Sequence, residues 1–178
     1  ITVFANILGE PATAATYSKL VEYNTVLIQP NAGTRRWYNF DRHIVHVLPS
    51  PDAEIFAQMS YIVKQYQFKR IGFMSDVAQD YGTELLPSVR AFADSIGASV
   101  VSHLKLNYTK STTAVDITEL TNMIVKKPHV ILNWGSLYAA NGLALTSLLL
   151  QLPDLVVLCS VGQLPIVDAV VRLLPATA

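Results

Sequence analysis

The chain has 178 residues, which is enough for one large domain or two modest lobes with a buried core. Apolar residues make up 51% of it and charged residues only 15%, so the composition excludes an intrinsically disordered segment. The formal net charge is zero and no basic face stands out, so we expect no binding to nucleic acid or to anionic lipid.

Local features narrow the alternatives further. The most apolar stretch, 143–161, is interrupted by Gln151, Pro153 and Asp154, so we expect no direct membrane insertion. The single cysteine, Cys159, excludes an internal disulfide framework, and its apolar surroundings predict a buried strand thiol. The chain opens on an apolar run without a methionine, and we expect both ends to continue in a longer parent, so targeting information is missing rather than negative.

Short apolar runs alternate with amphipathic stretches along the whole chain. The runs predict strands at 1–5, 25–29, 43–48, 70–74, 98–104, 129–134 and 155–160. Several are continuous apolar blocks rather than alternating patterns, as expected of parallel strands that are covered on both faces.

Helical patterns fill the gaps between these runs. The clearest is 52–66, where apolar residues share one stripe, Ser50 is a natural N-cap and Pro51 suits the first helical position. Further helices are predicted at 84–96, 115–126 and 137–152. Gly97 should end the first of these, and Pro87 should either mark its first turn or kink it.

The alternation predicts an α/β fold of open, mostly parallel sheets with right-handed crossovers. Pro49 and Pro51 around Ser50 make a stiff connection. We expect the chain to cross there, near 48–51, from the latter part of lobe one (1–49) to most of lobe two (50–178). In open α/β sheets the ligand lies outside the carboxyl ends of the strands, so the loops after the strands form the candidate site.

Those loops carry a resemblance to a known family. In order, the chain has Gln-Pro-Asn-Ala-Gly-Thr at 29–34, Pro-Asp at 51–52, Lys-Arg-Ile-Gly-Phe-Met at 69–74, Gln-Asp-Tyr-Gly at 79–82 and Asn-Trp-Gly at 133–135. This series resembles the type I periplasmic binding proteins of the branched-chain amino-acid class and the related receptor ectodomains. More narrowly, 70–74 and the preceding helix resemble ectodomains of trypanosomatid receptor-type adenylate cyclases. The resemblance implies two Rossmann-like lobes, with N- and C-terminal parts missing.

The resemblance also implies a ligand site between the lobes. The loop after the lobe-one strand would bind a ligand carboxylate through Ala32 and Thr34, or through Gly33, with Asn31 beside them. Asp52 would pair with a ligand amine, and Tyr81 would lie against the ligand from lobe two. The structural alternative is that the loop residues are ordinary turn formers and that Asp52 stabilises the helix dipole.

Two further groups are candidates with two interpretations each. Trp134 ends a strand and either lines the cleft or plugs the rim of the sheet. Arg35, Arg36 and Trp37 form a basic and aromatic cluster that either binds an anionic ligand through bidentate hydrogen bonds or is a solvated loop with one packed Trp.

Two positions depart from the family pattern. Leu137 stands where the family often has an aromatic residue, and Val161 stands where it has an acid. The amine-binding half of the site is therefore incomplete, which argues against an α-amino acid. The expected partner is a small molecule, either an amino acid or a small carboxylate-like compound.

Signals of catalysis are poor, and we expect no catalytic residue, metal or cofactor. His43 and His46 are three apart, which on a strand points them to opposite faces and disfavours a metal pair. There is no nucleophile elbow, phosphate-binding glycine loop or His-Glu-x-x-His motif. Asn107 fits an N-glycosylation sequon, which matters only in a secreted eukaryotic parent.

We therefore predict a sensor module, extracellular or periplasmic, that closes by a hinge around its ligand and passes the signal to a transporter or membrane receptor. It is not itself an enzyme, although a parent chain could carry a cyclase domain, and a homodimer is left open. The alternatives are a structural or protein-binding ectodomain that has lost its ligand, and an α/β enzyme domain.

Overall fold

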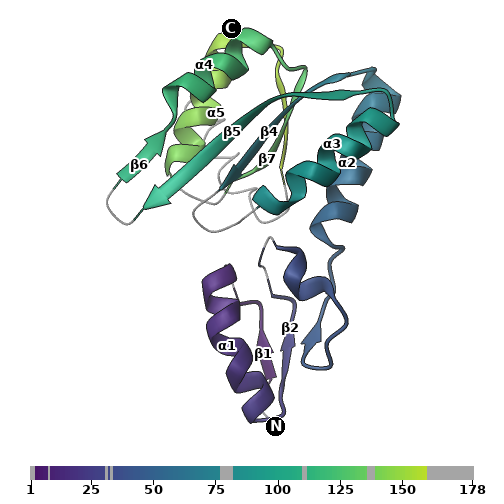
Figure 1. The fold of residues 1–178 in the computed structure, drawn as a ribbon, viewed down its shortest axis with the longest axis vertical. Helices are drawn as coiled ribbons and strands as arrows, with labels where there is room; N and C mark the ends of the chain where they lie inside the picture. The colour runs from purple at the N-terminus through teal and green to yellow at the C-terminus, as the bar shows by residue number, and fades with distance from the viewer. Residues whose placement is uncertain are drawn as a thin grey trace, which may run out of the picture.

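The computed structural model describes residues 3–7, 9–30, 32, 34–76, 82–109, 112–135 and 139–159. Within them, two β-sheets lie at opposite ends of the long axis of the molecule (Figure 1). The first sheet has the order β1-β2-β3, with strands Val3–Ala5, Val26–Ile28 and Ile44–Val45. Its paired strands are parallel, and α1 (Glu10–Glu22) lies beside it (Figure 1).

The second sheet has the order β6-β5-β4-β7-β8. Its strands are β4 (Arg70–Asp76), β5 (Ser99–Thr109), β6 (Thr112–Val115), β7 (Val130–Trp134) and β8 (Val156–Cys159). β5 and β6 pair antiparallel, and the other pairs are parallel. The predicted α/β fold of mostly parallel sheets is confirmed.

Helices cover both faces of the second sheet (Figure 1). The pair α2 (Pro51–Tyr66) and α3 (Leu86–Ser95) covers one face, and the pair α4 (Ile117–Lys126) and α5 (Ala139–Gln151) covers the other. The first core contains Ile55, Met59, Ile62, Ile71, Phe73, Leu85, Val89, Leu132 and Trp134, among others. The second contains Met74, Leu104, Leu106, Met123, Ile131, Leu145 and Leu148, among others. The strands read as continuous apolar runs because both of their faces are buried.

The ends of two predicted helices have the expected chemistry. Ser50 caps α2, since its hydroxyl accepts the backbone N–H of Ala53 at 3.3 Å, and Pro51 is the first helical residue. α3 begins at Leu86 after the short 3-10 turn η2 (Thr83–Leu85), so Pro87 lies in the first turn. The N–H that proline lacks would have no helical partner there. Gly97 follows the helix with φ of +75°, as a helix-ending glycine does.

Several elements differ from the prediction: α1 and β6 were missed, and β3, β5 and α4 differ from it in their bounds. No helix was predicted at Glu10–Glu22, where α1 lies. This segment is rich in Ala and Thr, and only its residues Thr13 and Leu20 are fully buried, so it shows no clear apolar stripe. The helix expected at 115–126 begins at Ile117, because the Asp116 side chain accepts the N–H groups of the first turn at 2.8 and 3.1 Å. Strand β6, which precedes it, was not predicted and ends at Val115.

Cys159 corrects one expectation. It is a free thiol at the end of β8, as the strand prediction implies, but its side chain is half-buried rather than buried. The reason is that β8 is an edge strand of the sheet among the residues that the structure describes. Burial, with a smaller contribution from Glu54, raises the pKa of the thiol.

His103 makes the stability of the second sheet depend on pH. Its Nε2 lies 2.8 Å from the hydroxyl oxygen of Ser75, and its ring packs on Phe73 with the ring centres 5.6 Å apart. Burial, and then the charges of Lys105 and Arg90, lowers the pKa of His103 to about 4 from its ordinary 6.5. Between these values the unfolded chain binds the proton and the folded chain does not, so stability is complete above the ordinary pKa and is lost as the pH falls toward about 4.

We expect the melting temperature of the wild type to fall more steeply than that of His103→Gln when the pH is lowered through this window. Circular dichroism melts at a series of pH values measure both curves, and the acidic groups common to both proteins cancel in the comparison. Parallel curves would show that His103 does not supply this pH dependence.

Candidate functional site

The two sheets meet through residues that follow their strands. The 3-10 turn η1 (Arg35–Tyr38) follows β2 of the first sheet. Asp52 is the second residue of α2, and Glu84 and Ser88 follow β4 of the second sheet. Arg35 contacts all three, and we call the four residues the inter-sheet junction. The carboxyl-terminal side of β2 is thereby joined to the starts of two helices that pack on the second sheet.

The central contact of the junction is a bidentate ion pair. Nε of Arg35 donates to Oδ2 of Asp52 at 2.6 Å, and its Nη2 donates to Oδ1 at 2.5 Å. Nη2 also donates to the hydroxyl of Ser88, whose oxygen lies 3.0 Å from Oδ1 of Asp52 and 2.9 Å from the carbonyl oxygen of Leu85. The backbone N–H of Arg35 donates to the carboxylate of Glu84. The hydrogen bond to Asp52 raises the pKa of Arg35.

The loop after β2 is held by Glu10, the first residue of α1. One carboxylate oxygen of Glu10 accepts the hydroxyl of Thr34 at 2.7 Å and the indole N–H of Trp37 at 2.6 Å. Arg36 pairs with the other oxygen at 3.7 Å and lies over the Trp37 ring at 4.5 Å. Thr34 and Trp37 are both buried, at 4% exposure. The basic and aromatic cluster predicted as Arg35, Arg36 and Trp37 thus contains one packed Trp and two arginines with carboxylate partners.

The remaining predicted site residues fall into two groups. Ala32 is described and buried, whereas Asn31, Gly33 and Tyr81 lie outside the described residues, as do Leu137 and Val161. Of the residues predicted to contact ligand, Asp52 belongs to the junction and Thr34 directly precedes Arg35. Neither Glu10 nor Ser88 was a candidate, because an acid or serine near a helix start has an ordinary capping or dipole role.

Trp134 lies in the core of the second sheet. It ends β7, is 1% exposed and packs in the core between the second sheet and helices α2 and α3. Gly82 lies directly against it with φ of +79°, and a Cβ there would be 2.7 Å from the Cβ of Trp134. Only glycine combines that backbone conformation with so close an approach.

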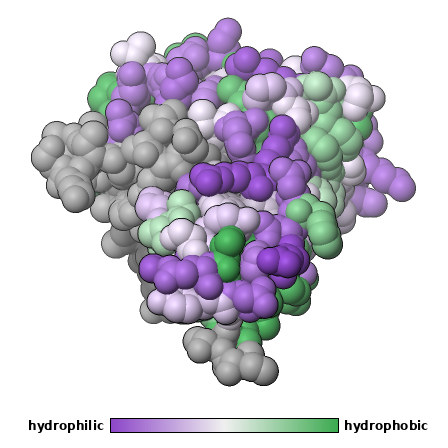
Figure 2. All heavy atoms as spheres, turned by 60° about the horizontal axis from the view of Figure 1, so that its bottom comes forward, coloured by the Kyte–Doolittle hydropathy of each residue, from purple (hydrophilic) through white to green (hydrophobic). Residues whose placement is uncertain are grey.

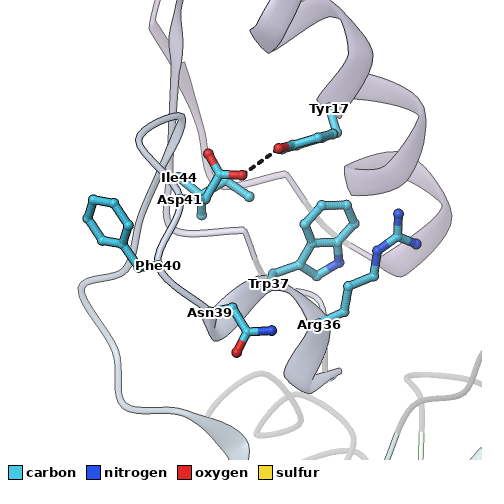
Figure 3. A pocket seen from close by; sticks show the side chains of 7 residues that line it. All are labelled: Tyr17, Arg36, Trp37, Asn39, Phe40, Asp41 and Ile44. Atoms are coloured by element: carbon cyan, nitrogen blue, oxygen red, sulfur yellow. Dashed lines mark hydrogen bonds between the residues drawn. The ribbon is translucent and has the colours of Figure 1, made fainter.

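A separate pocket lies on the first sheet's side of the molecule (Figure 3). Its volume is ≈ 170 Å³, and its lining consists of Tyr17, Arg36, Trp37, Asn39, Phe40, Asp41 and Ile44. The Tyr17 hydroxyl donates to Asp41 at 2.5 Å, which raises the pKa of Tyr17 and lowers that of Asp41. The pocket is smaller than sites for drug-sized ligands, which are about 300–1,000 Å³.

The end of the molecule that carries the first sheet is mostly hydrophilic, with hydrophobic side chains in separate groups (Figure 2). Phe40, beside the pocket, is 99% exposed. Isolated apolar residues such as Phe40 are common on water-exposed surfaces. Elsewhere in the described chain, no helix is long and apolar enough to cross a membrane.

The two histidines near the first sheet have backbone partners. Nδ1 of His43 lies 2.9 Å from the carbonyl oxygen of Thr25, and Nε2 of His46 lies 2.6 Å from that of Trp37. Among the residues that the structure describes, no group of three or more His, Cys, Asp or Glu side chains is placed to hold a metal ion.

Comparison with known proteins finds similarity in structure alone. No protein-family model matches the chain, and no curated protein matches it in sequence. An extracellular ligand-binding receptor from Rhodopseudomonas palustris HaA2 superimposes with a TM-score of 0.76 at 16% identity, over 100% of this chain and 54% of the receptor. A substrate-binding periplasmic protein from Ralstonia solanacearum has a TM-score of 0.74 at 15% identity, over 93% of this chain and 46% of that protein.

A third solved structure contains a small ligand. It is a solute-binding protein of an ABC transporter from Rhodopseudomonas palustris BisB5 in complex with 3,4-dihydroxybenzoic acid. Its TM-score is 0.64 at 16% identity, over 88% of this chain and 42% of that protein. The chain therefore has the fold of the periplasmic binding proteins and spans about half the length of these structures.

Proposed function

We propose that the chain is a small-molecule-binding module whose ligand lies between the two sheets, beside the inter-sheet junction. The observation that carries the proposal is that Arg35, which follows β2, contacts Asp52 and Ser88 at the starts of α2 and α3. Ligands of open α/β sheets lie outside the carboxyl ends of the strands, so a small molecule there could touch loops of both sheets. The neighbouring structures, which are solute-binding proteins and receptors, support the same function.

The proposed contacts are those predicted from the sequence. The loop from Asn31 through Ala32 and Gly33 to Thr34 would approach the ligand from the first sheet. Asp52 and Tyr81 would approach it from the second, and Trp134 would support that side from within the core. The branched-chain amino-acid class and the receptor-type adenylate cyclase parent stay predictions.

Ligand binding would be coupled to closure of two lobes, 1–49 and 50–178. The backbone change would be absorbed near 48–51, where Pro49 and Pro51 flank the N-cap Ser50. We propose that a transporter or a membrane receptor recognises the closed form, outside the cell or in the periplasm. One of the structural neighbours is described as a solute-binding protein of a transporter, which supports the first of these outputs. A homodimer also stays a prediction.

A thermal-shift screen tests the proposal. The protein is melted with amino acids, small carboxylates, sugars and nucleosides over a range of concentrations. A ligand that binds only the folded chain raises the melting temperature in a saturable way, by an amount set by its concentration relative to its Kd. We expect one class to do so. We expect Tyr81→Ala to abolish the shift, and Asp52→Ala to do the same because it removes the partner that orients Arg35.

Asp94→Ala is the matched control, because Asp94 is an exposed acid on α3 away from the junction. It should leave the ligand-induced shift intact. If every class leaves a well-folded sample unmoved, small-molecule binding is wrong and a structural or protein-binding ectodomain replaces it.

A further inference from the structure

The polar groups of Thr34 and Asp52 that would bind an amino acid are already satisfied within the protein. The Thr34 hydroxyl donates its only hydrogen to Glu10 at 2.7 Å, so it has none to donate to a ligand carboxylate. The Asp52 carboxylate accepts two N–H groups of Arg35 at 2.6 and 2.5 Å, in the place where a ligand amine would pair with it. An α-amino acid would have to break these contacts to bind in the family's manner.

The guanidinium of Arg35 still has hydrogen-bond donors available for a ligand. Nε gives its hydrogen to Asp52, and Nη2 gives its hydrogens to Asp52 and Ser88. Both hydrogens of Nη1 have no partner among the residues that the structure describes, and the side chain is 42% exposed. A guanidinium whose orientation is fixed by a bidentate partner can bind a carboxylate oxygen through Nη1 with little further loss of side-chain entropy.

The junction holds one guanidinium and two carboxylates, so an anion there would be held by the hydrogen bonds of Nη1 and not by a net positive charge. Asp52 is paired with the guanidinium, so its charge is offset within the junction. Glu84 accepts the backbone N–H of Arg35 and is exposed, where water and salt screen its charge. Arg36, the next cation along the chain, is directed to Glu10 and lies over Trp37.

We infer that the ligand is a small carboxylate without an ammonium group and that Arg35 determines this specificity. Arg35 takes the place of a ligand amine opposite Asp52 and binds the ligand carboxylate through Nη1. This rests on the proposed function, and it narrows the expected ligand from an amino acid or a small carboxylate-like compound to the second of these.

Isothermal titration of the full chain with matched pairs of compounds tests the specificity. The pairs are 3-phenylpropanoate with L-phenylalanine and 4-methylpentanoate with L-leucine, since the members of each pair differ only by the ammonium group. We expect the acid of at least one pair to bind at least about tenfold more tightly than its amino acid. The ammonium group of the amino acid would either find no partner or have to displace Arg35 from Asp52.

Variants at the junction separate Arg35 from other causes. Arg35→Gln should weaken binding of the acid about tenfold or more, because a charge-assisted hydrogen bond is lost, and should improve binding of the amino acid, because Asp52 becomes available to the amine. The double variant Arg35→Gln with Asp52→Asn should lose the acid without gaining the amino acid. Arg90→Gln, which removes an exposed arginine of α3, should change neither.

The outcomes distinguish the two proposals. If amino acids bind the wild type as tightly as the matched acids, or if Arg35→Gln leaves the preference unchanged, the specificity is wrong while small-molecule binding stands. If only sugars or nucleosides from the wider screen bind, the specificity is wrong as well. If no compound of any class binds a folded sample, the proposed function itself is wrong. Should Arg35→Gln fail to fold, Arg35→Lys keeps the charge but loses the bidentate geometry, and it must still weaken acid binding.

Discussion

Replacing Trp134 by alanine is expected to lower the free energy of unfolding by about 3–5 kcal/mol, the usual cost of removing a buried large aromatic side chain. Trp134 is 1% exposed and packs in the core between the second sheet and helices α2 and α3. Its removal would leave a cavity beside Gly82, whose backbone approaches it closely and has no side chain to fill the space. Urea unfolding followed by circular dichroism measures the change.

Two comparisons make this result specific. Trp134→Phe should cost much less than Trp134→Ala, because it retains most of the buried ring surface. Phe40→Ala removes an aromatic ring that is 99% exposed and should leave stability within about 0.5 kcal/mol. If Trp134→Ala is no more destabilising than Phe40→Ala, Trp134 does not belong to the core and the arrangement of β7 is wrong.

Glu10→Ala is expected to lower the free energy of unfolding by about 2–4 kcal/mol. The change removes the acceptor of two buried donors, the Thr34 hydroxyl and the Trp37 indole N–H, and each unsatisfied buried group costs about 1–3 kcal/mol. The same carboxylate pairs with Arg36. Since η1 carries Arg35 directly after this loop, we also expect weaker ligand binding in this variant.

Glu22→Ala is the matched control for Glu10→Ala. Glu22 ends the same helix and pairs with Lys19 at 2.6 Å, but both side chains of that pair are about half exposed, at 50% and 55%. Exposed pairs contribute about 0–1 kcal/mol, so its loss should be small. Equal losses in the two variants would mean that Glu10 acts as an ordinary surface acid and does not hold the loop.

The fold of the second sheet could be predicted because its signals are local. The strand at Val130–Trp134 is a continuous buried run, and α2 has an apolar stripe, a serine N-cap and a proline at its first position. Both patterns are set by neighbours in the chain. β6 could not be predicted, because a short antiparallel edge strand is defined by its pairing with β5 rather than by its own composition.

The candidate site could be predicted only in part, because its contacts join distant segments. Arg35 was a candidate for bidentate binding of an anion, and Asp52 was a candidate for binding an amine. That the two residues pair with each other depends on how the loop after β2 lies against the start of α2. Glu10 holds Thr34 and Trp37 across 24 and 27 positions of the chain, and no pattern in the sequence marks such a contact.

Hydrogen–deuterium exchange with and without the tightest ligand of the screen tests whether one small molecule contacts both sheets at the inter-sheet junction. We expect saturation with that ligand to slow exchange in segment 34–38, which follows β2. We expect exchange to slow together with it in segment 51–54, which begins α2, and in segment 83–88, which comprises η2 and the start of α3. Slower exchange in the segments of one sheet only, or only around the pocket of Tyr17 and Asp41, would contradict it.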